Sequence, residues 1–222
     1  RTKLYRTVDR FVSLGSAITQ TGESAALPDI KRPQLMSTPA QQAAALQAMG
    51  LNDQSPVLAL CPGAEYGPAK RWPPEYFAAL ARDYLAHGWQ VWLFGSEKDT
   101  TITQHIVEQA EGAIDLAGKT NLAQAIDLLA ASQCVVSNDS GLMHIAAATG
   151  APLVALYGSS DPQYTPPLSE HAEVLYRGLE CSPCFKRECP LGHLDCLRGI
   201  TPAQVTEALK RLQLSTATAT ED

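Results

Sequence analysis

From Val57 onward, short runs of apolar residues alternate with longer segments in which apolar residues recur at helical spacing. The short runs predict strands at residues 57–61, 90–94, 114–117, 134–137 and 153–157. The longer segments predict helices at residues 74–86, 100–110, 122–131 and 141–149. Because this alternation is typical of βαβ crossovers, it predicts an α/β fold: a doubly wound parallel sheet with helices on both faces.

The segments on either side of this pattern differ from it. Residues 1–14 predict a short amphipathic helix, and residues 15–37 have the Gly and Pro content of a linker. Thr38 and Pro39 begin a predicted helix over residues 39–49, which Gly50 ends. Residues 158–200 are rich in Pro, Gly and Cys and show no periodicity, and a last helix begins at Thr201 and Pro202.

Composition narrows the class of protein. Hydrophobic residues make up 45% of the chain, which is typical of a globular protein, and the net charge of −6 gives no electrostatic footprint for nucleic acid. The longest apolar runs fall far short of the roughly 20 residues that span a bilayer, and the N-terminus lacks the apolar core of a signal peptide. The chain begins at Arg1 rather than Met, so we expect a processed chain, a fragment or an excised domain.

In a doubly wound sheet, ligands bind at the carboxyl ends of the strands. The predicted strand at 134–137 is followed by a polar turn and a helix, and this turn holds Asp139, Ser140 and Gly141. Free backbone N–H groups and the positive end of the helix dipole suit an anion such as a pyrophosphate there, and His144 lies one turn further. The alternative is an ordinary helix cap with a histidine that faces the core.

Two more loops at strand ends carry charged residues. Lys70 and Arg71 lie beside Trp72 in a loop stiffened by Pro and Gly, an arrangement that suits phosphate; alternatively both cations are solvated and Trp72 is a packing anchor. Glu97 follows the next strand and is a candidate to accept hydrogen bonds from ribose, with Asp99 as a helix cap; alternatively both residues are caps. The G-x-G-x-x-G, P-loop and G-x-S-x-G motifs are absent, which disfavours simple dehydrogenases, P-loop NTPases and α/β-hydrolases.

A cluster of cysteines lies in the segment without periodicity. The chain has six cysteines, and the spacing C-x2-C-x4-C-x6-C relates Cys181, Cys184, Cys189 and Cys196, with His193 between the last two. These thiols could hold a structural zinc ion, remain as buried reduced thiols, or form disulfides that pin a long loop. Six cysteines are too few for a disulfide scaffold, and we expect a reducing compartment.

At these residues the chain resembles the ADP-heptose:lipopolysaccharide heptosyltransferases of glycosyltransferase family 9. The resemblance runs from about Pro56 to Leu212, and its motifs occur in one order: CPGAEYGPAKRWP, LFGS, NDSGLMHIAAA, LVALYGS and TPPLS. It implies a GT-B architecture of two Rossmann-like domains, of which this chain supplies the C-terminal, donor-binding half. We therefore expect residues 1–50 to be the end of the N-terminal region, the linker and a leading helix, residues 51–214 the domain that binds ADP-heptose, and residues 215–222 a polar tail.

The resemblance also implies roles for the residues at the strand ends. Lys70 would contact the phosphates of ADP and Glu97 the ribose. The turn before the predicted helix at residues 141–149, together with His144, would surround the pyrophosphate and sugar; this turn comprises Asp139, Ser140 and Gly141. The family's catalytic base is an Asp of the N-terminal domain, to which no position here corresponds, and the cysteine segment is not tied to the family's chemistry.

The activity that the resemblance implies is inverting transfer of L-glycero-D-manno-heptose from ADP-heptose to the first heptose of the Kdo-lipid A inner core. No metal cofactor is expected, and a cytoplasmic enzyme with at most peripheral contact to the inner membrane is implied. Three alternatives remain: a non-catalytic nucleotide-binding domain, another GT-B relative such as a nucleotide-sugar epimerase that prefers UDP, and an interaction module held together by zinc.

Overall fold

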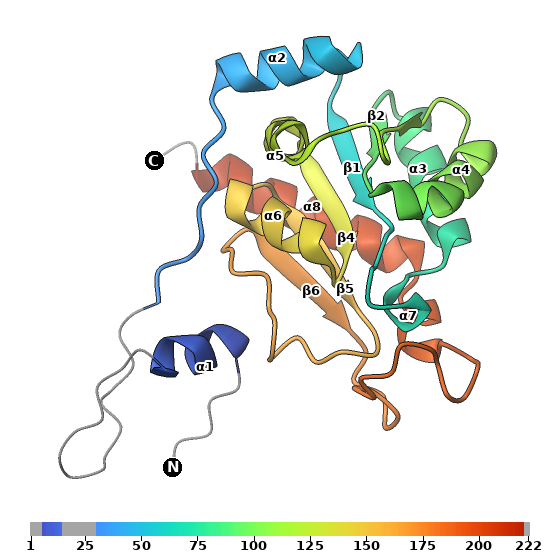
Figure 1. The fold of residues 1–222 in the computed structure, drawn as a ribbon. Coiled ribbons are helices and arrows are strands. Elements are labelled where there is room, and N and C mark those ends of the chain that lie inside the picture. Colours follow the sequence, from blue (N-terminus) through green and yellow to red (C-terminus); the bar gives the residue numbers. More distant parts are fainter. Residues whose placement is uncertain (1–5, 15–29, 220–222) are drawn as a thin grey trace, which may run out of the picture.

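The computed structural model describes residues 6–14 and 30–219, with side chains as far as residue 214 (Figure 1). Residues 1–5 of the predicted first helix, residues 15–29 of the predicted linker and residues 220–222 of the predicted tail lie outside the described residues.

The sheet has six strands, and all of its neighbouring strands pair in parallel. The strands are β1 (Val57–Cys61), β2 (Gln90–Leu93), β3 (Ile114–Asp115), β4 (Cys134–Asn138), β5 (Leu153–Tyr157) and β6 (Ala172–Tyr176). Their order across the sheet is β3-β2-β1-β4-β5-β6. The predicted fold class is therefore confirmed, and β1 and β5 have the predicted bounds.

Helices cover both faces of this sheet (Figure 1). One face packs against α3 (Pro74–Ala86), α4 (Thr100–Gln109) and α8 (Pro202–Ala219). The other packs against α2 (Pro39–Met49), α5 (Leu122–Ala131) and α6 (Gly141–Thr149). In β1, Leu58 and Leu60 face the first layer while Val57 and Ala59 face the second, because side chains alternate along a strand. Burial on both sides explains why the central strands β1 and β5 are continuous apolar runs.

Helix α2 shows how closely local sequence can determine an element. Thr38 accepts a hydrogen bond from the Gln41 backbone N–H, and the Gln41 side chain accepts one from the Thr38 backbone N–H. Gly50 ends the helix in the left-handed conformation, at φ 64°. Ala45 and Leu46 bury against the layer that contains α5. The division of the chain at residue 50 stays a prediction.

Within residues 158–200, where the sequence shows no periodicity and no element was predicted, the structure has strand β6 and the short helix α7 (Asp195–Arg198). Strand β6 lies at the edge of the sheet and is only half buried, so it shows neither a continuous apolar run nor a strict alternation. The last helix extends to Ala219, into the predicted tail. Two short 3-10 helices, η1 (Pro68–Lys70) and η2 (Glu97–Asp99), also form in loops at strand ends.

Helix α1 (Thr7–Leu14) confirms the predicted amphipathic segment over its described residues. None of its residues is buried, and the Thr7 backbone N–H donates to the Tyr164 carbonyl over 2.7 Å. This helix therefore rests on the edge of the α/β unit rather than contributing to its core.

Candidate functional site

The strand order reverses between β1 and β4, so the loops that follow these strands diverge at the carboxyl edge of the sheet. Asn138, the last residue of β4, is fully buried between them. Its side-chain amide donates to the Pro62 carbonyl over 2.7 Å, and its side-chain oxygen accepts from the Trp72 backbone N–H over 3.0 Å. One side chain thus holds both ends of the loop that carries Lys70.

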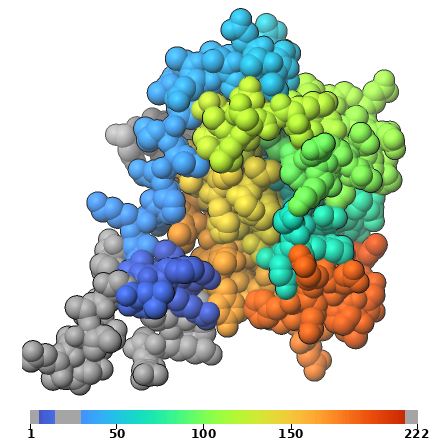
Figure 2. Space-filling view, viewed as in Figure 1, coloured from blue at the N-terminus to red at the C-terminus, as the bar shows by residue number. Residues whose placement is uncertain are grey.

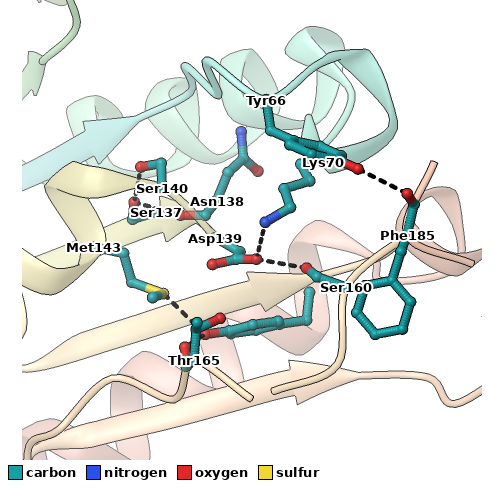
Figure 3. Close-up of polar contacts among 11 residues, drawn as sticks. Tyr66, Lys70, Ser137, Asn138, Asp139, Ser140, Met143, Ser160, Thr165 and Phe185 are labelled. Atoms are coloured by element: carbon teal, nitrogen blue, oxygen red, sulfur yellow. Dashed lines mark hydrogen bonds and ion pairs between the residues drawn. The ribbon is translucent and has the colours of Figure 1, made fainter. Parts of the chain in front are cut away.

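Lys70 and Asp139 meet at this edge (Figure 3). The Lys70 ammonium lies 2.5 Å from a carboxylate oxygen of Asp139, and the Ser160 hydroxyl donates to the same oxygen over 2.5 Å. The side chains of Lys70 and Asp139 are only 17% and 5% exposed. The ammonium also lies 5.1 Å from the centre of the Tyr66 ring, within the range of a cation–π contact. The structure therefore brings together two residues that the sequence placed in separate loops.

The start of α6 presents free backbone donors beside this pair. Ser140 is the N-cap residue, yet its side chain makes no capping hydrogen bond and lies 3.4 Å from the Ser137 hydroxyl. Gly141 is exposed, and a Cβ atom there would meet no other atom within 4 Å. This arrangement suits an anion that approaches the helix N-terminus, and it disfavours the alternative in which the Ser140 side chain serves as the cap.

A pocket of about 330 Å³ opens next to this helix start. Its walls come from the loop after β1, the end of β2 with the loop that follows it, the start of α5 and the start of α6; they include Ala64, Phe94, Asn121, Ser140 and Gly141. The volume is at the lower end of the range for small-molecule sites. Neither Lys70 nor Asp139 is part of the pocket wall; Asp139 directly precedes Ser140 of the wall, and Lys70 contacts Asp139.

The two carboxylates after β2 have different surroundings. Asp99 is buried, and its carboxylate accepts from the backbone N–H and hydroxyl of Ser96 over 2.9 and 2.7 Å. Asp99 occupies the predicted N-cap position of α4, but its side chain makes no capping bond to that helix and instead completes a capping box with Ser96 on η2. A Cβ at Gly63 would lie 2.5 Å from the Asp99 carboxyl carbon, so only glycine fits there. Glu97 is exposed on η2 and is not part of the pocket wall, although Ser96 and Asp99 are. Its role toward ribose stays a prediction.

Arg71 and Trp72, which are neighbours in sequence, have different surroundings. Trp72 is buried, its indole N–H donates to the Ile200 carbonyl over 2.7 Å, and its ring packs edge-on against Phe77. Trp72 is therefore a packing anchor, as the alternative given in the sequence analysis proposed. Arg71 donates to the Ala64 carbonyl over 3.3 Å, and its buried Nε atom has no hydrogen-bond partner among the described residues.

His144 lies on α6, exposed and within electrostatic range of Lys70 and Asp139. The pKa of its imidazole is lowered, chiefly because surrounding protein displaces water from the ring. The Asp139 carboxylate opposes this shift and the Lys70 ammonium adds to it. His144 is absent from the pocket wall, so its role toward a ligand stays a prediction.

The cysteine segment folds into one loop beside the site. All six cysteines are free thiols. Cys181 is exposed, Cys184 and Cys189 are half-buried, and Cys196 is buried. Among the described residues, no group of three or more His, Cys, Asp or Glu side chains is arranged to hold a metal ion. Zinc was one of three alternatives for these thiols, and the geometry of the described residues does not support it.

Sequence analysis missed Asn138, Ser160 and Tyr66 as residues that position the site. Ser160 lies in the loop after β5, and its position at a strand end is the signal that could have identified it. Asn138 is the last residue of a strand, and its two hydrogen bonds reach loops 76 and 66 residues away in sequence.

No described helix is both long enough and apolar enough to cross a membrane.

Comparison with known proteins identifies the family. The model for glycosyltransferase family 9 (heptosyltransferase) matches residues 3–195. Lipooligosaccharide heptosyltransferase 2 of Haemophilus influenzae is 43% identical over 92% of this chain and 62% of its own length. Lipopolysaccharide heptosyltransferase 2 of Escherichia coli is 40% identical over 93% and 61%.

Solved structures agree with these matches. The structure of E. coli ADP-heptose lps heptosyltransferase II superposes with a TM-score of 0.82 at 39% identity, covering 96% of this chain and 63% of that one. A family 9 glycosyl transferase from Veillonella parvula superposes with a TM-score of 0.71 at 29% identity, covering 86% and 57%. The chain thus spans about three fifths of the length of these relatives. It belongs to glycosyltransferase family 9.

Proposed function

We propose that this chain is the donor-binding part of a heptosyltransferase that uses ADP-heptose and acts on the lipopolysaccharide inner core. The observation that carries the proposal is the meeting of Lys70, Asp139 and the uncapped start of α6 at the point where the strand order reverses. The similarity to heptosyltransferases 2 supports heptosyl transfer, and the E. coli ADP-heptose lps heptosyltransferase II supports ADP-heptose as the donor.

The site can bind the diphosphate through two sets of donors. The first backbone N–H groups of α6 point outward beside the pocket, and the helix dipole favours negative charge there. An ammonium has three N–H donors, so Lys70 can keep its bond to Asp139 and still donate to a phosphate oxygen. Asp139 and Tyr66 then hold the Lys70 side chain in place before the ligand arrives.

The same donors suit the chemistry of glycosyl transfer. An acceptor hydroxyl attacks the anomeric carbon, the bond from that carbon to the phosphate oxygen breaks, and ADP departs with the additional negative charge. In the proposed arrangement Lys70 and the start of α6 stabilise that charge, because both are held in place before the ligand binds. Attack opposite the leaving group inverts the anomeric centre, and the resemblance to the family assigns the base to its other domain.

The proposed acceptor is the first heptose of the Kdo-lipid A inner core, as the resemblance implies. Because that acceptor is made on the inner leaflet, the proposed place of action is the cytoplasmic side of the inner membrane, with at most peripheral contact. The proposed site uses no metal cofactor.

Calorimetric titration of the chain with ADP, UDP and GDP tests the proposal, each titration being repeated with EDTA. We expect ADP to bind in preference to the other two nucleotides and its affinity to be indifferent to EDTA. Preference for UDP would instead favour an epimerase-like relative. Absence of ADP binding by the folded chain would contradict a donor site formed by these residues alone.

A further inference from the structure

The four clustered thiols share one small cavity behind the proposed donor site. Cys181, Cys184, Cys189 and Cys196 all line a space of about 20 Å³, together with Ser159. Ser159 is 1% exposed, and its hydroxyl oxygen has no hydrogen-bond partner among the described residues. Buried polar groups without partners are rare, so this cavity is a place where polar or reactive chemistry is accommodated.

One of the four thiols is set apart by its backbone surroundings. Burial raises the pKa of Cys189, but backbone N–H groups of residues 191–194 point at its sulfur and lower the pKa below the ordinary value. Cys61 and Cys134, buried within strands, have pKa values raised to about 12. Because the thiolate is the reactive form, Cys189 is far more nucleophilic near neutral pH than the strand cysteines.

The arrangement favours sulfur–sulfur chemistry over metal binding. The described thiols form no group arranged to hold a metal ion, yet all four line one cavity with room for little more than a water molecule. A low-pKa thiol with others beside it is typical of reversible oxidation to a disulfide.

The cysteine loop, residues 181–196, is also tied to the loop that carries Lys70. The Tyr66 hydroxyl donates to the Phe185 carbonyl over 2.7 Å, and the Arg187 guanidinium donates to the Tyr66 carbonyl over 2.7 Å. The Ala69 backbone N–H donates to the Arg187 carbonyl over 2.9 Å. Figure 2 shows the orange loop packed against the teal loop after β1, and Figure 3 shows the contact between Tyr66 and Phe185.

A second set of bonds ties the cysteine loop to the segment that carries Ser160. The Phe185 backbone N–H donates to the Ser159 carbonyl over 2.7 Å, and the Ser182 hydroxyl donates to the Gly158 carbonyl over 2.5 Å. The cysteine loop therefore holds the backbone next to both residues that bond Asp139, namely Lys70 and Ser160.

We propose that the four cysteines of this loop form a thiol modification site. Its oxidation by peroxide to a disulfide disrupts the contact between the Tyr66 ring and the Lys70 ammonium and weakens donor binding. The effect on donor binding rests on the proposed function, whereas the formation of the disulfide is independent of it.

The chemistry proceeds in two balanced steps. The Cys189 thiolate attacks one oxygen of hydrogen peroxide, the S–O bond forms, the O–O bond breaks, and hydroxide leaves; sulfur is oxidised to sulfenic acid. A neighbouring thiol of the cavity then attacks that sulfur, the S–S bond forms, and the S–O bond breaks to release water. Drawing two sulfur atoms to bonding distance displaces the backbone that offers the Phe185 and Arg187 carbonyls to Tyr66 and Ala69.

The test compares reduced, peroxide-treated and re-reduced samples of the full chain. Intact mass after alkylation in denaturant is expected to show the loss of two free thiols, and peptide mapping is expected to place Cys189 in the disulfide. Hydrogen exchange at the Ala69 amide is expected to accelerate on oxidation. ADP affinity is expected to fall by about fivefold or more and to recover with dithiothreitol.

Two variants sharpen the test. Cys189→Ser is expected to keep the ADP affinity of the reduced chain and to lose the response to peroxide. Tyr66→Phe removes only the bond to the Phe185 carbonyl and is expected to weaken ADP binding without oxidation. If Cys189→Ser fails to fold, recovery of the unaltered chain on reduction carries the same information.

Several outcomes would overturn the proposal. These are oxidation that leaves the thiol count unchanged, a disulfide with unchanged Ala69 exchange and ADP affinity, and stoichiometric zinc or iron on the thiols by elemental analysis. If the reduced chain fails to bind ADP, the proposed function fails, while disulfide formation and Ala69 exchange still decide whether the site responds to oxidation.

Discussion

Two lysine–carboxylate pairs lie at the same edge of the sheet in contrasting surroundings. Lys70 meets Asp139 over 2.5 Å with side chains 17% and 5% exposed, whereas Lys98 meets Glu65 over 2.8 Å with side chains 74% and 76% exposed. Distance alone would rank them nearly equal. Burial distinguishes the two pairs. Water and salt screen the exposed Lys98–Glu65 pair, here called the outer pair, whereas the buried Lys70–Asp139 pair, the inner pair, depends on its protein partners.

The inner pair is therefore expected to have a role that the outer pair does not have. Taking two charges out of water costs free energy, and the pair recovers that cost only through good geometry and additional hydrogen bonds, here from Ser160. A buried ion pair is weak evidence for stability. It is better explained as a means of holding the Lys70 ammonium ready beside an anion site.

The largest expected effect is on Asp139. Replacing Asp139 with Ala leaves the Lys70 ammonium without its partner and should lower the free energy of unfolding by about 3 to 5 kcal/mol, measured by urea denaturation. The double variant Lys70→Met, Asp139→Leu should recover part of that loss, because it removes both charges. A single-variant loss no larger than that of the outer pair would show that burial does not distinguish them.

Replacing Lys70 with Ala should weaken ADP binding by about 1 to 3 kcal/mol, as expected for the loss of a charge-assisted hydrogen bond. Calorimetric titration of a sample verified as folded measures this effect. Lys210→Ala is the matched control, since Lys210 lies on α8 and pairs with Glu207. Equal affinities for the Lys70 variant and the unaltered chain would remove Lys70 from the site.

His144 adds a smaller, pH-dependent effect beside the inner pair. Because its pKa is lowered in the folded state, the unfolded chain takes up a proton first as the pH falls below the ordinary value of 6.5. The free energy of unfolding should therefore decrease between about pH 7 and pH 5, and His144→Gln should reduce this decrease. His105→Gln, on the exposed face of α4, is the control, and an unchanged slope in the His144 variant would contradict the assignment.

The smallest expected effect is on the outer pair. Lys98→Ala should leave the urea midpoint within the reproducibility of the measurement, because both side chains of the pair are largely exposed to water. Repeating the comparison in high salt should remove any residual difference. A clear loss in Lys98→Ala that persists in high salt would show that this pair does more than its exposure indicates.

Most of the fold follows from local sequence because its signals are local. Thr38, Pro39 and Gly50 define α2 through a capping box and a left-handed terminator, and the buried strands are apolar on both faces. Strand β6 was missed because its place at the sheet edge depends on pairing with β5 rather than on its own residues. The strand order also depends on pairing between distant segments and has no local signature.

The candidate site was predicted unevenly for a related reason. Asp139, Ser140 and Gly141 follow a buried strand directly, so their position at its carboxyl end could be inferred from the chain. Glu97 met the same criterion, but the 3-10 turn leaves it exposed outside the pocket wall. The contribution of Ser160 depends on a contact across 21 residues that only folding creates.

The sequence by itself determined the α/β class, the main helices and strands, and which loops lie at the carboxyl ends of strands, because hydrophobic period and capping act over a few residues. Only the tertiary structure decided that Lys70 meets Asp139 and Ser160, that Asn138 holds the Lys70 loop, and that the cysteine loop lies behind it. These contacts join residues far apart along the chain, so they exist only once the order of the strands has brought their loops together.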